Sequence, residues 1–219
     1  MLPILREGLV LELHFNELNG SIVYDLSGYN NNGTIYGATR VNEGFVRALS
    51  FDGMDDYVRV EYIELPLPFT VSFWFRFPTA PPPSRAQAVI DEGFGTGYNW
   101  WFHIDRRPEL YKDRGVPAFA TRGGGSIVNY YYYLYSDRWY HITVVSNAGM
   151  YVNGELVVPG SISEFTRASN PLYFMRDSYS PPSYTVGYLD EVLIYNRALS
   201  EEEIKTLYNY YTKKKIFER

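Results

Sequence analysis

The sequence predicts an all-β protein, a two-sheet antiparallel sandwich closed by one short C-terminal helix. Short segments of alternating apolar and polar residues recur along the chain, separated by turn signals about every 8–12 residues. Aromatic residues make up 18% of the chain, with 22 Tyr and 13 Phe, and such residues favour strands. No linker or internal repeat divides the 219 residues, so we predict a single domain spanning 1–219.

Two early segments define the expected core. In Gly8–Phe15 every second residue is a large apolar one, which predicts a strand with an inner and an outer face. Phe69–Phe77 is the clearest strand, because its odd positions are apolar and Trp74 and Arg76 lie on the other face. Between them, Asn16–Thr34 is polar and rich in Gly and Asn, which predicts turns. Further strands are predicted at 48–52, 57–61, 86–91, 99–105, 116–122, 127–135, 139–147, 150–153, 155–158 and 172–175.

The C-terminal segment predicts a buried strand followed by a helix. Both alternating sets of residues in 186–195 are largely apolar, as expected for a strand covered on both faces. Ser200 and Glu203 have the spacing of a capping box, and Leu199 and Ile204 that of a hydrophobic staple. The apolar face of the helix is formed by Ile204, Leu207, Tyr208 and Tyr211.

Composition excludes several functions. The net charge of −5 gives no basic field for nucleic acid. The absence of Cys excludes disulfides and thiolate metal sites, and no apolar run is long enough to insert in a membrane. The start of the chain lacks the features of a signal peptide. The missing Cys and the single Gln87 are weakly typical of thermophile proteins.

Several short motifs occur in one order along nearly the whole chain. They include Leu9–Phe15, Asp25-Leu-Ser-Gly28, Ala48-Leu-Ser-Phe-Asp-Gly53, Phe69-Thr-Val-Ser-Phe-Trp74, Arg138-Trp-Tyr-His-Ile142, Met150-Tyr-Val-Asn-Gly-Glu155 and Leu189–Ser200. In this order they resemble the laminin G-like, concanavalin A-like jelly-roll domains. The resemblance implies a jelly-roll sandwich. The functions of that family include sugar binding, protein adhesion and service as a passenger domain of larger enzymes.

The resemblance also implies a calcium site at the rim of the sheet, because many relatives carry one there. If the first and last strands pair, Asn16 and Glu17 approach Asp190, and Asp25 is the fourth candidate ligand. A second acidic cluster is Asp52, Asp55 and Asp56. The alternative is that Asp25 caps its own Ser-Gly turn and that 52–56 is an Asx turn.

A ligand platform is expected on the strand face that carries Trp74. Aromatic rings stack on the C–H surfaces of sugars, and charged or imidazole groups bond to hydroxyls. The candidates are Trp74, Arg76, Trp100, Trp101, His103, Asp105, Arg122 and His141. The alternative is that these tryptophans pack under loops or against the Tyr-rich segment 130–133.

Enzymatic readings have little support. The Glu-x-Asp-x-x-Glu pattern of laminarinase-type hydrolases is absent, and Asp190 and Glu191 are adjacent, so they face opposite sides of a strand. The three histidines, His14, His103 and His141, lack the spacing of zinc ligands.

We therefore predict a non-catalytic recognition domain that binds a glycan on a concave sheet face. The alternative is a structural or adhesion protein of a cell surface or virion that makes protein contacts, and a third, weaker hypothesis is a diverged glycosidase. An extracellular, cell-surface or virion location is expected, and the oligomeric state is left open.

Overall fold

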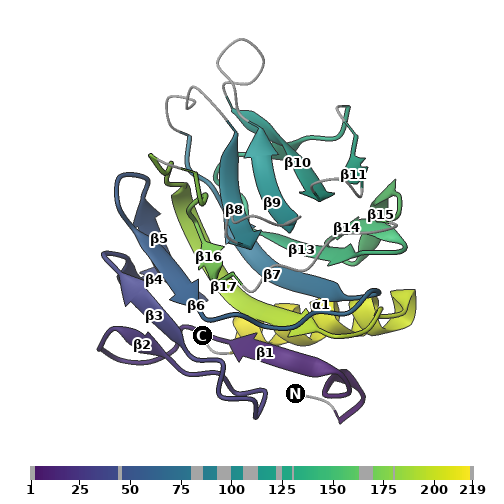
Figure 1. The fold of residues 1–219 in the computed structure, drawn as a ribbon, viewed down its shortest axis with the longest axis horizontal. Coiled ribbons are helices and arrows are strands. Elements are labelled where there is room, and N and C mark those ends of the chain that lie inside the picture. The colour runs from purple at the N-terminus through teal and green to yellow at the C-terminus, as the bar shows by residue number, and fades with distance from the viewer. Residues whose placement is uncertain are drawn as a thin grey trace.

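The computed structural model describes residues 3–43, 46–79, 86–92, 100–105, 113–121, 125–129, 131–162, 170–179 and 181–217. Within these residues the chain forms two antiparallel β-sheets, a short 3-10 turn η1 (Pro3–Leu5) and one α-helix, α1 (Glu201–Phe217) (Figure 1). The predicted jelly-roll sandwich with one C-terminal helix is confirmed. No helix in the described part of the chain has the length and apolar character that crossing a membrane requires.

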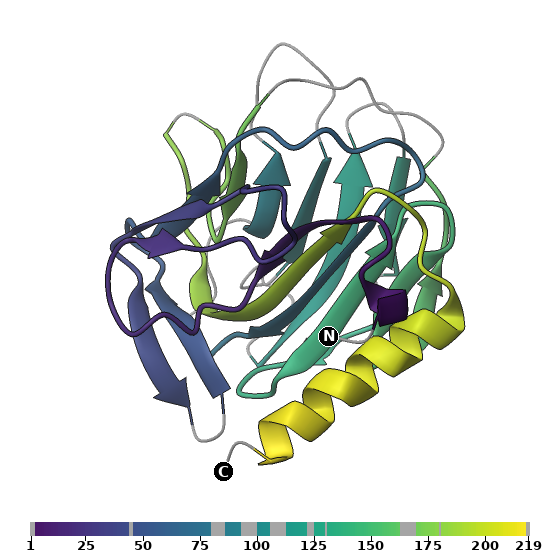
Figure 2. The same cartoon turned by 90° about the horizontal axis from the view of Figure 1, so that it is seen from below.

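The helix-side sheet is the one whose outer face carries α1 (Figure 2). Its strands run in the spatial order β15 (Glu155–Pro159), β14 (Gly149–Val152), β13 (Tyr140–Val145), β7 (Thr70–Arg76), β17 (Val186–Tyr195), β5 (Val46–Asp52) and β4 (Thr39–Glu43). The first strand, β1 (Leu9–Leu13), pairs with the second half of β17, from Leu9 opposite Tyr195 to Leu13 opposite Val192. The predicted pairing of the first and last strands is therefore confirmed.

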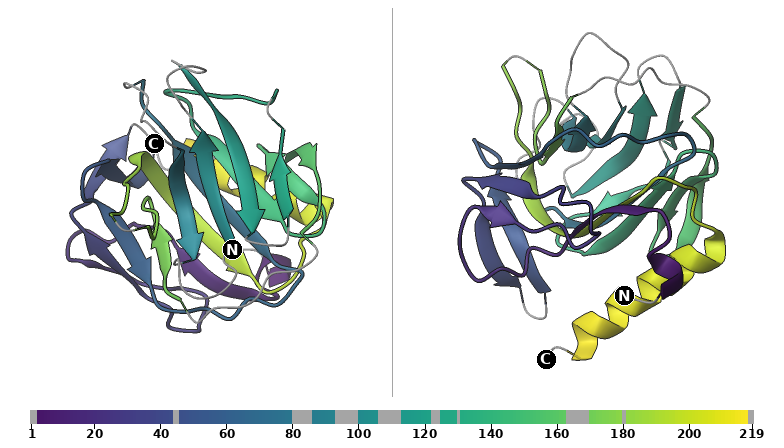
Figure 3. Two further views of the ribbon diagram at one scale, coloured as in Figure 1. Left: turned by 45° about the horizontal axis from the view of Figure 1, so that its top comes forward. Right: turned by 60° about the horizontal axis from the view of Figure 1, so that its bottom comes forward.

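The opposite sheet forms the other layer of the sandwich and is seen in front in the left view of Figure 3. Its spatial order is β11 (Gly125–Val128), β10 (Arg114–Thr121), β9 (Trp100–Asp105), β8 (Gln87–Glu92), β16 (Leu172–Phe174), β6 (Tyr57–Val60), β3 (Gly33–Tyr36) and β2 (Ile22–Val23), with β12 (Leu134–Tyr135) beside β10.

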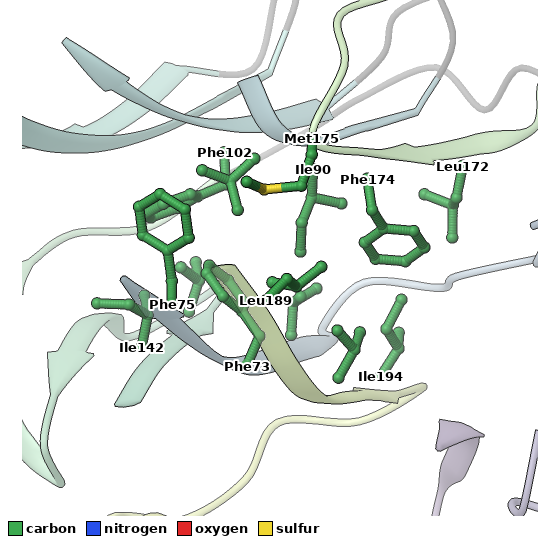
Figure 4. Packing of buried hydrophobic residues seen from close by; sticks show 14 of the residues in the cluster. Phe73, Phe75, Ile90, Phe102, Ile142, Leu172, Phe174, Met175, Leu189 and Ile194 are labelled. Carbon is green, nitrogen blue, oxygen red and sulfur yellow. The ribbon is translucent and has the colours of Figure 1, made fainter. Parts of the chain in front are cut away.

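The core lies between the two sheets and is built from the inward residues of both. Phe73 of β7 meets Phe102 of β9 edge to face, with ring centroids 5.1 Å apart (Figure 4). The apolar positions predicted for Phe69–Phe77 are all buried in this core. Because the inward positions are filled on both sheets, the remaining side chains of each strand point to an outer face.

Three parts of the fold differ from the sequence prediction. The polar segment 16–34 contains the short strand β2 and the start of β3, and β4 was not predicted. The predicted strand 127–135 is two short strands, β11 and β12, which pair with different parts of β10. The helix continues to Phe217, beyond the apolar face from which it was predicted.

The predicted cap of α1 is confirmed. Ser200 N donates to Glu203 Oε2 at 2.8 Å, and Glu203 N donates to Ser200 Oγ at 3.2 Å. Arg197 Nη2 also donates to Glu203 Oε1 at 2.6 Å, and this bond lowers the pKa of the Glu203 carboxyl.

We expect Ser200→Ala to lower the free energy of unfolding by about 1 kcal/mol, because the N-terminal N–H groups of α1 lose their acceptor. Urea unfolding followed by circular dichroism would measure the loss. Ser161→Ala, at an exposed serine outside any helix or strand, is the control. Equal losses in the two variants would contradict a stabilising role for the cap.

Candidate functional site

Trp74, the centre of the predicted platform, is not available to a ligand. It lies on the outer face of β7, as predicted, but its side chain is buried beneath α1. Its indole stacks on the ring of Tyr208 at 5.9 Å and belongs to an apolar cluster with Leu193 and Ile204. The prediction is corrected because the C-terminal helix packs on the face that was assigned to the ligand.

The two predicted neighbours of Trp74 have structural contacts as well. His141 is opposite Trp74 on β13 and is fully buried, and its Nε2 lies 2.8 Å from Ser72 Oγ. Arg76 lies at the end of β7, 5.0 Å from the ring centre of Tyr188 and 3.5 Å from an Asp137 oxygen. His141 is therefore part of the packing under α1, and Arg76 is held at the end of β7 by Tyr188 and Asp137.

The other four platform candidates described lie on β9, in the opposite sheet. Trp100 points into the core, 5.5 Å from the Phe69 ring, so it is also excluded as a ligand residue. Trp101, His103 and Asp105 occupy successive outward positions of the strand. The structure thus brings these three together, but on the sheet layer opposite Trp74. Arg122 lies outside the described residues.

Trp101 and His103 line a cavity of about 270 Å³ at the outer face of β8 and β9, which we call the Trp101 pocket. The strands beside them carry small outward residues: Ala88 and Ala118 flank His103, and Ala120 is beside Trp101. Alanines on both sides of His103 and on one side of Trp101 leave room over the imidazole and indole rings. The remaining lining residues are Ala86, Asp91, Asp177 and Tyr179.

Two carboxylates, Asp91 and Asp177, are the acidic groups that line the pocket. Asp91, opposite Trp101, accepts hydrogen bonds from Ser178 Oγ at 3.0 Å and Ser178 N at 3.3 Å. Asp177 accepts from Ser183 N at 2.8 Å and from Ser183 Oγ. Burial, together with the Asp177 charge, raises the pKa of Asp91 to about 6, against the opposing hydrogen bonds from Ser178. The bonds to Asp91 hold Ser178 against β8, and the neighbouring Asp177 and Tyr179 line the pocket.

The four residues predicted to bind calcium do not form one ligand set. Both carboxylate oxygens of Asp25 are occupied, by Glu12 N, Ser27 N, Ser27 Oγ and Asn31 N at 2.7–2.9 Å. Asn16 and Glu17 line a separate hollow beside Arg40, and Asp190 is paired with Trp74 under the helix. The arrangement does not fit a cation, which needs six or more converging oxygens. Asp25 instead caps its own turn.

Acidic side chains of the described residues converge at Asp52, Asp55 and Asp56, each with an oxygen within 4.8 Å of the others. Asp52 Oδ1 accepts from Met54 N at 2.7 Å, and Asp56 Oδ2 accepts from Asp52 N at 2.9 Å. These are the bonds of an Asx turn. Burial and the neighbouring charges raise the pKa of Asp56.

Comparison with known proteins gives relatives among bacterial toxins. Paraclostridial mosquitocidal protein 1 of Paraclostridium bifermentans is 33% identical over 85 residues, which is 36% of this chain and 7% of that protein. Its solved binding domain superposes with a TM-score of 0.70 and 21% identity, over 94% of this chain and 53% of that one.

The binding domain of botulinum neurotoxin DC has the same fold. It was solved in complex with SialylT and with rat synaptotagmin II, and the TM-scores to this chain are 0.67 and 0.68. In both cases the identity is 18%, and the match covers 94% of this chain and 52% of the other. This chain therefore spans about half the length of these solved binding domains.

The sequence profile of one family matches residues 52–205, well over half of the chain. The matched range contains the strands of the Trp101 pocket and both strands, β7 and β17, at the centre of the helix-side sheet. The chain belongs to the concanavalin A-like lectin/glucanase superfamily.

Proposed function

We propose that this domain is a non-catalytic recognition module that binds a glycan in the Trp101 pocket. The observation that carries the proposal is the combination of one outward indole, one imidazole and two carboxylates around a hollow made by small residues. The indole offers an apolar face to sugar C–H groups, and the polar groups fix hydroxyl orientation. The toxin relatives are binding domains, and one was solved with SialylT, which favours the same kind of ligand.

The chemistry of the pocket favours binding over hydrolysis. Glycosidases of the usual kind place two free carboxyl groups on either side of the scissile bond. Here the Asp91 and Asp177 carboxylates accept hydrogen bonds from Ser178 and Ser183, so neither is a free carboxyl group. The toxin relatives support a site of action outside the cell, at a target surface.

We expect Trp101→Ala to weaken glycan binding at least tenfold, because the apolar face of the pocket is lost. A glycan array would identify ligands, and isothermal titration calorimetry would measure the affinity for the strongest. Trp139→Ala is the matched control, since Trp139 is a half-buried tryptophan that packs on Tyr188 of β17, away from the Trp101 pocket. Equal affinities of Trp101→Ala and wild type would refute the pocket as the binding site.

A second candidate function is recognition of a surface protein. The segments on either side of β2, between β1 and β3, expose Leu18 at 86%, Tyr29 at 62% and Leu26 at 52%. The four hydrogen bonds accepted by Asp25 tie residues 25–31 to Glu12 of β1, so Leu26 and Tyr29 are presented on an ordered part of this segment. Protease-sensitive binding to cells that is lost in Tyr29→Ser, together with an empty glycan array, would favour this function.

A further inference from the structure

A second group of outward side chains lies beside the Trp101 pocket on the opposite sheet. The guanidinium carbon of Arg176 is 4.7 Å from the ring centre of Tyr173, 4.9 Å from that of Tyr57 and 5.9 Å from that of Tyr184. The ring of Tyr36 stacks on Tyr57 at 4.4 Å with an interplanar angle of 10°. We call these five residues the tyrosine–arginine cluster.

Strand register places this cluster and the pocket on one face. Arg59 of β6 is opposite Tyr173 of β16, Tyr173 is opposite Asp91 of β8, and Asp91 is opposite Trp101 of β9. Residues directly opposite each other point to the same side of a sheet. Tyr173 and Trp101 are two strands apart, which corresponds to about 10 Å. One oligosaccharide can therefore contact both.

The two arginines of this face differ in their partners. Arg59 Nη1 makes an ion pair with Glu61 Oε1 at 2.6 Å. Arg176 makes no side-chain hydrogen bond or ion pair within the described part of the chain, and its Nε is buried without an acceptor. Three tyrosine ring faces are its neighbours, and the Asp91 carboxylate attracts it without forming an ion pair. These interactions compensate only part of the cost of desolvating a charge.

We propose that Arg176 and the surrounding tyrosines bind the acidic group of a glycan whose neutral part occupies the Trp101 pocket. A guanidinium fork matches the oxygens of a carboxylate or a sulfate, and the tyrosine rings flank the sugar that bears the group. This inference rests on the proposed glycan-binding function and specifies its ligand as an anionic sugar.

The test uses the 219-residue chain and pairs of glycans that differ only in the acidic group: sialylated, uronic-acid and sulfated glycans, each with its neutral counterpart. We expect the wild type to bind the acidic member of at least one pair tenfold more tightly, and the advantage to shrink between 50 and 500 mM NaCl. The kind of pair with the largest difference in affinity between its acidic and neutral members shows whether the site prefers a carboxylate or a sulfate.

Arg176→Gln is expected to remove this advantage and leave the affinity for the neutral glycan unchanged, whereas Trp101→Ala weakens binding of both. Arg59→Gln, which removes an arginine from the same face, is the control and should keep the advantage. Melting temperatures check that each variant is folded, and the salt comparison on the wild type needs no variant. Equal wild-type affinities within every pair, or equal effects of Arg176→Gln and Arg59→Gln, would overturn the anionic subsite while leaving the glycan pocket intact. A lack of any glycan binding would overturn both.

Discussion

Replacement of Trp74 by alanine is expected to lower the free energy of unfolding by about 3–5 kcal/mol and to leave glycan affinity unchanged. The indole fills the space between β7 and α1, against Tyr208, Leu193 and Ile204. Its removal leaves a cavity at the joint between sheet and helix. Chemical denaturation with urea measures the loss, and binding is compared at a temperature where the variant is folded.

Trp139→Ala serves again as the control, and its loss should be smaller because that side chain is only half-buried. Trp74→Phe keeps an aromatic ring at the joint and allows the measurement if the alanine variant does not fold. A stable Trp74→Ala protein that has lost its glycan would show instead that the face of Trp74 is the binding face, and that α1 moves away from it.

The local sequence pattern could not show which of Trp74 and Trp101 is open to a ligand. Each tryptophan alternates with core residues along its strand, and each points to an outer face. What distinguishes them is whether another element covers that face, and this depends on contacts between residues far apart in the chain. The apolar stripe of α1 was a usable signal, because Leu207 and Tyr211 require an apolar partner and the outer face of β7 and β17 offers Trp74 and Leu193.

The tyrosine–arginine cluster was missed for a related reason. Its members come from β3, β6, β16 and the segment after β16, and only strand register brings them together. Tyr36 also lies on a strand that follows a run of Asn and Gly, which reads as turns. By contrast, Asp25 and the Ser200 cap were predictable because their partners lie within a few residues.

The second prediction with a large expected effect on stability concerns the buried ionic network around His14. His14 Nε2 lies 2.9 Å from Glu12 Oε1, and His14 Nδ1 contacts Glu191 Oε2. Both carboxylates are buried, Arg6 reaches Glu12 at 3.3 Å, and the Tyr211 ring of α1 is 6.2 Å from the imidazole. Burial alone would lower the pKa of His14, but the hydrogen bonds and charges of Glu12 and Glu191 outweigh it and raise the pKa to about 9.

Because the pKa of His14 is raised, the fold is expected to lose stability as the pH becomes alkaline. The ordinary pKa of histidine is 6.5, so the stabilisation by the imidazolium is complete below that value and is lost as the pH rises to about 9. A shift of this size corresponds to about 3 kcal/mol. We expect His14→Gln to be less stable than wild type by about this amount at pH 6, because two buried carboxylates lose the cation between them.

The difference between the two proteins should then shrink towards zero as the pH approaches 10. Urea unfolding at intervals from pH 6 to pH 10 measures the free energy of unfolding of both proteins. Taking the difference between them at each pH cancels the titration of the groups that they share. Ser161→Ala, which should parallel the wild type throughout, is the control for substitution elsewhere. If His14→Gln also ran parallel to the wild type over this range, His14 would be neutral in the folded protein, and the imidazolium would contribute nothing to its stability.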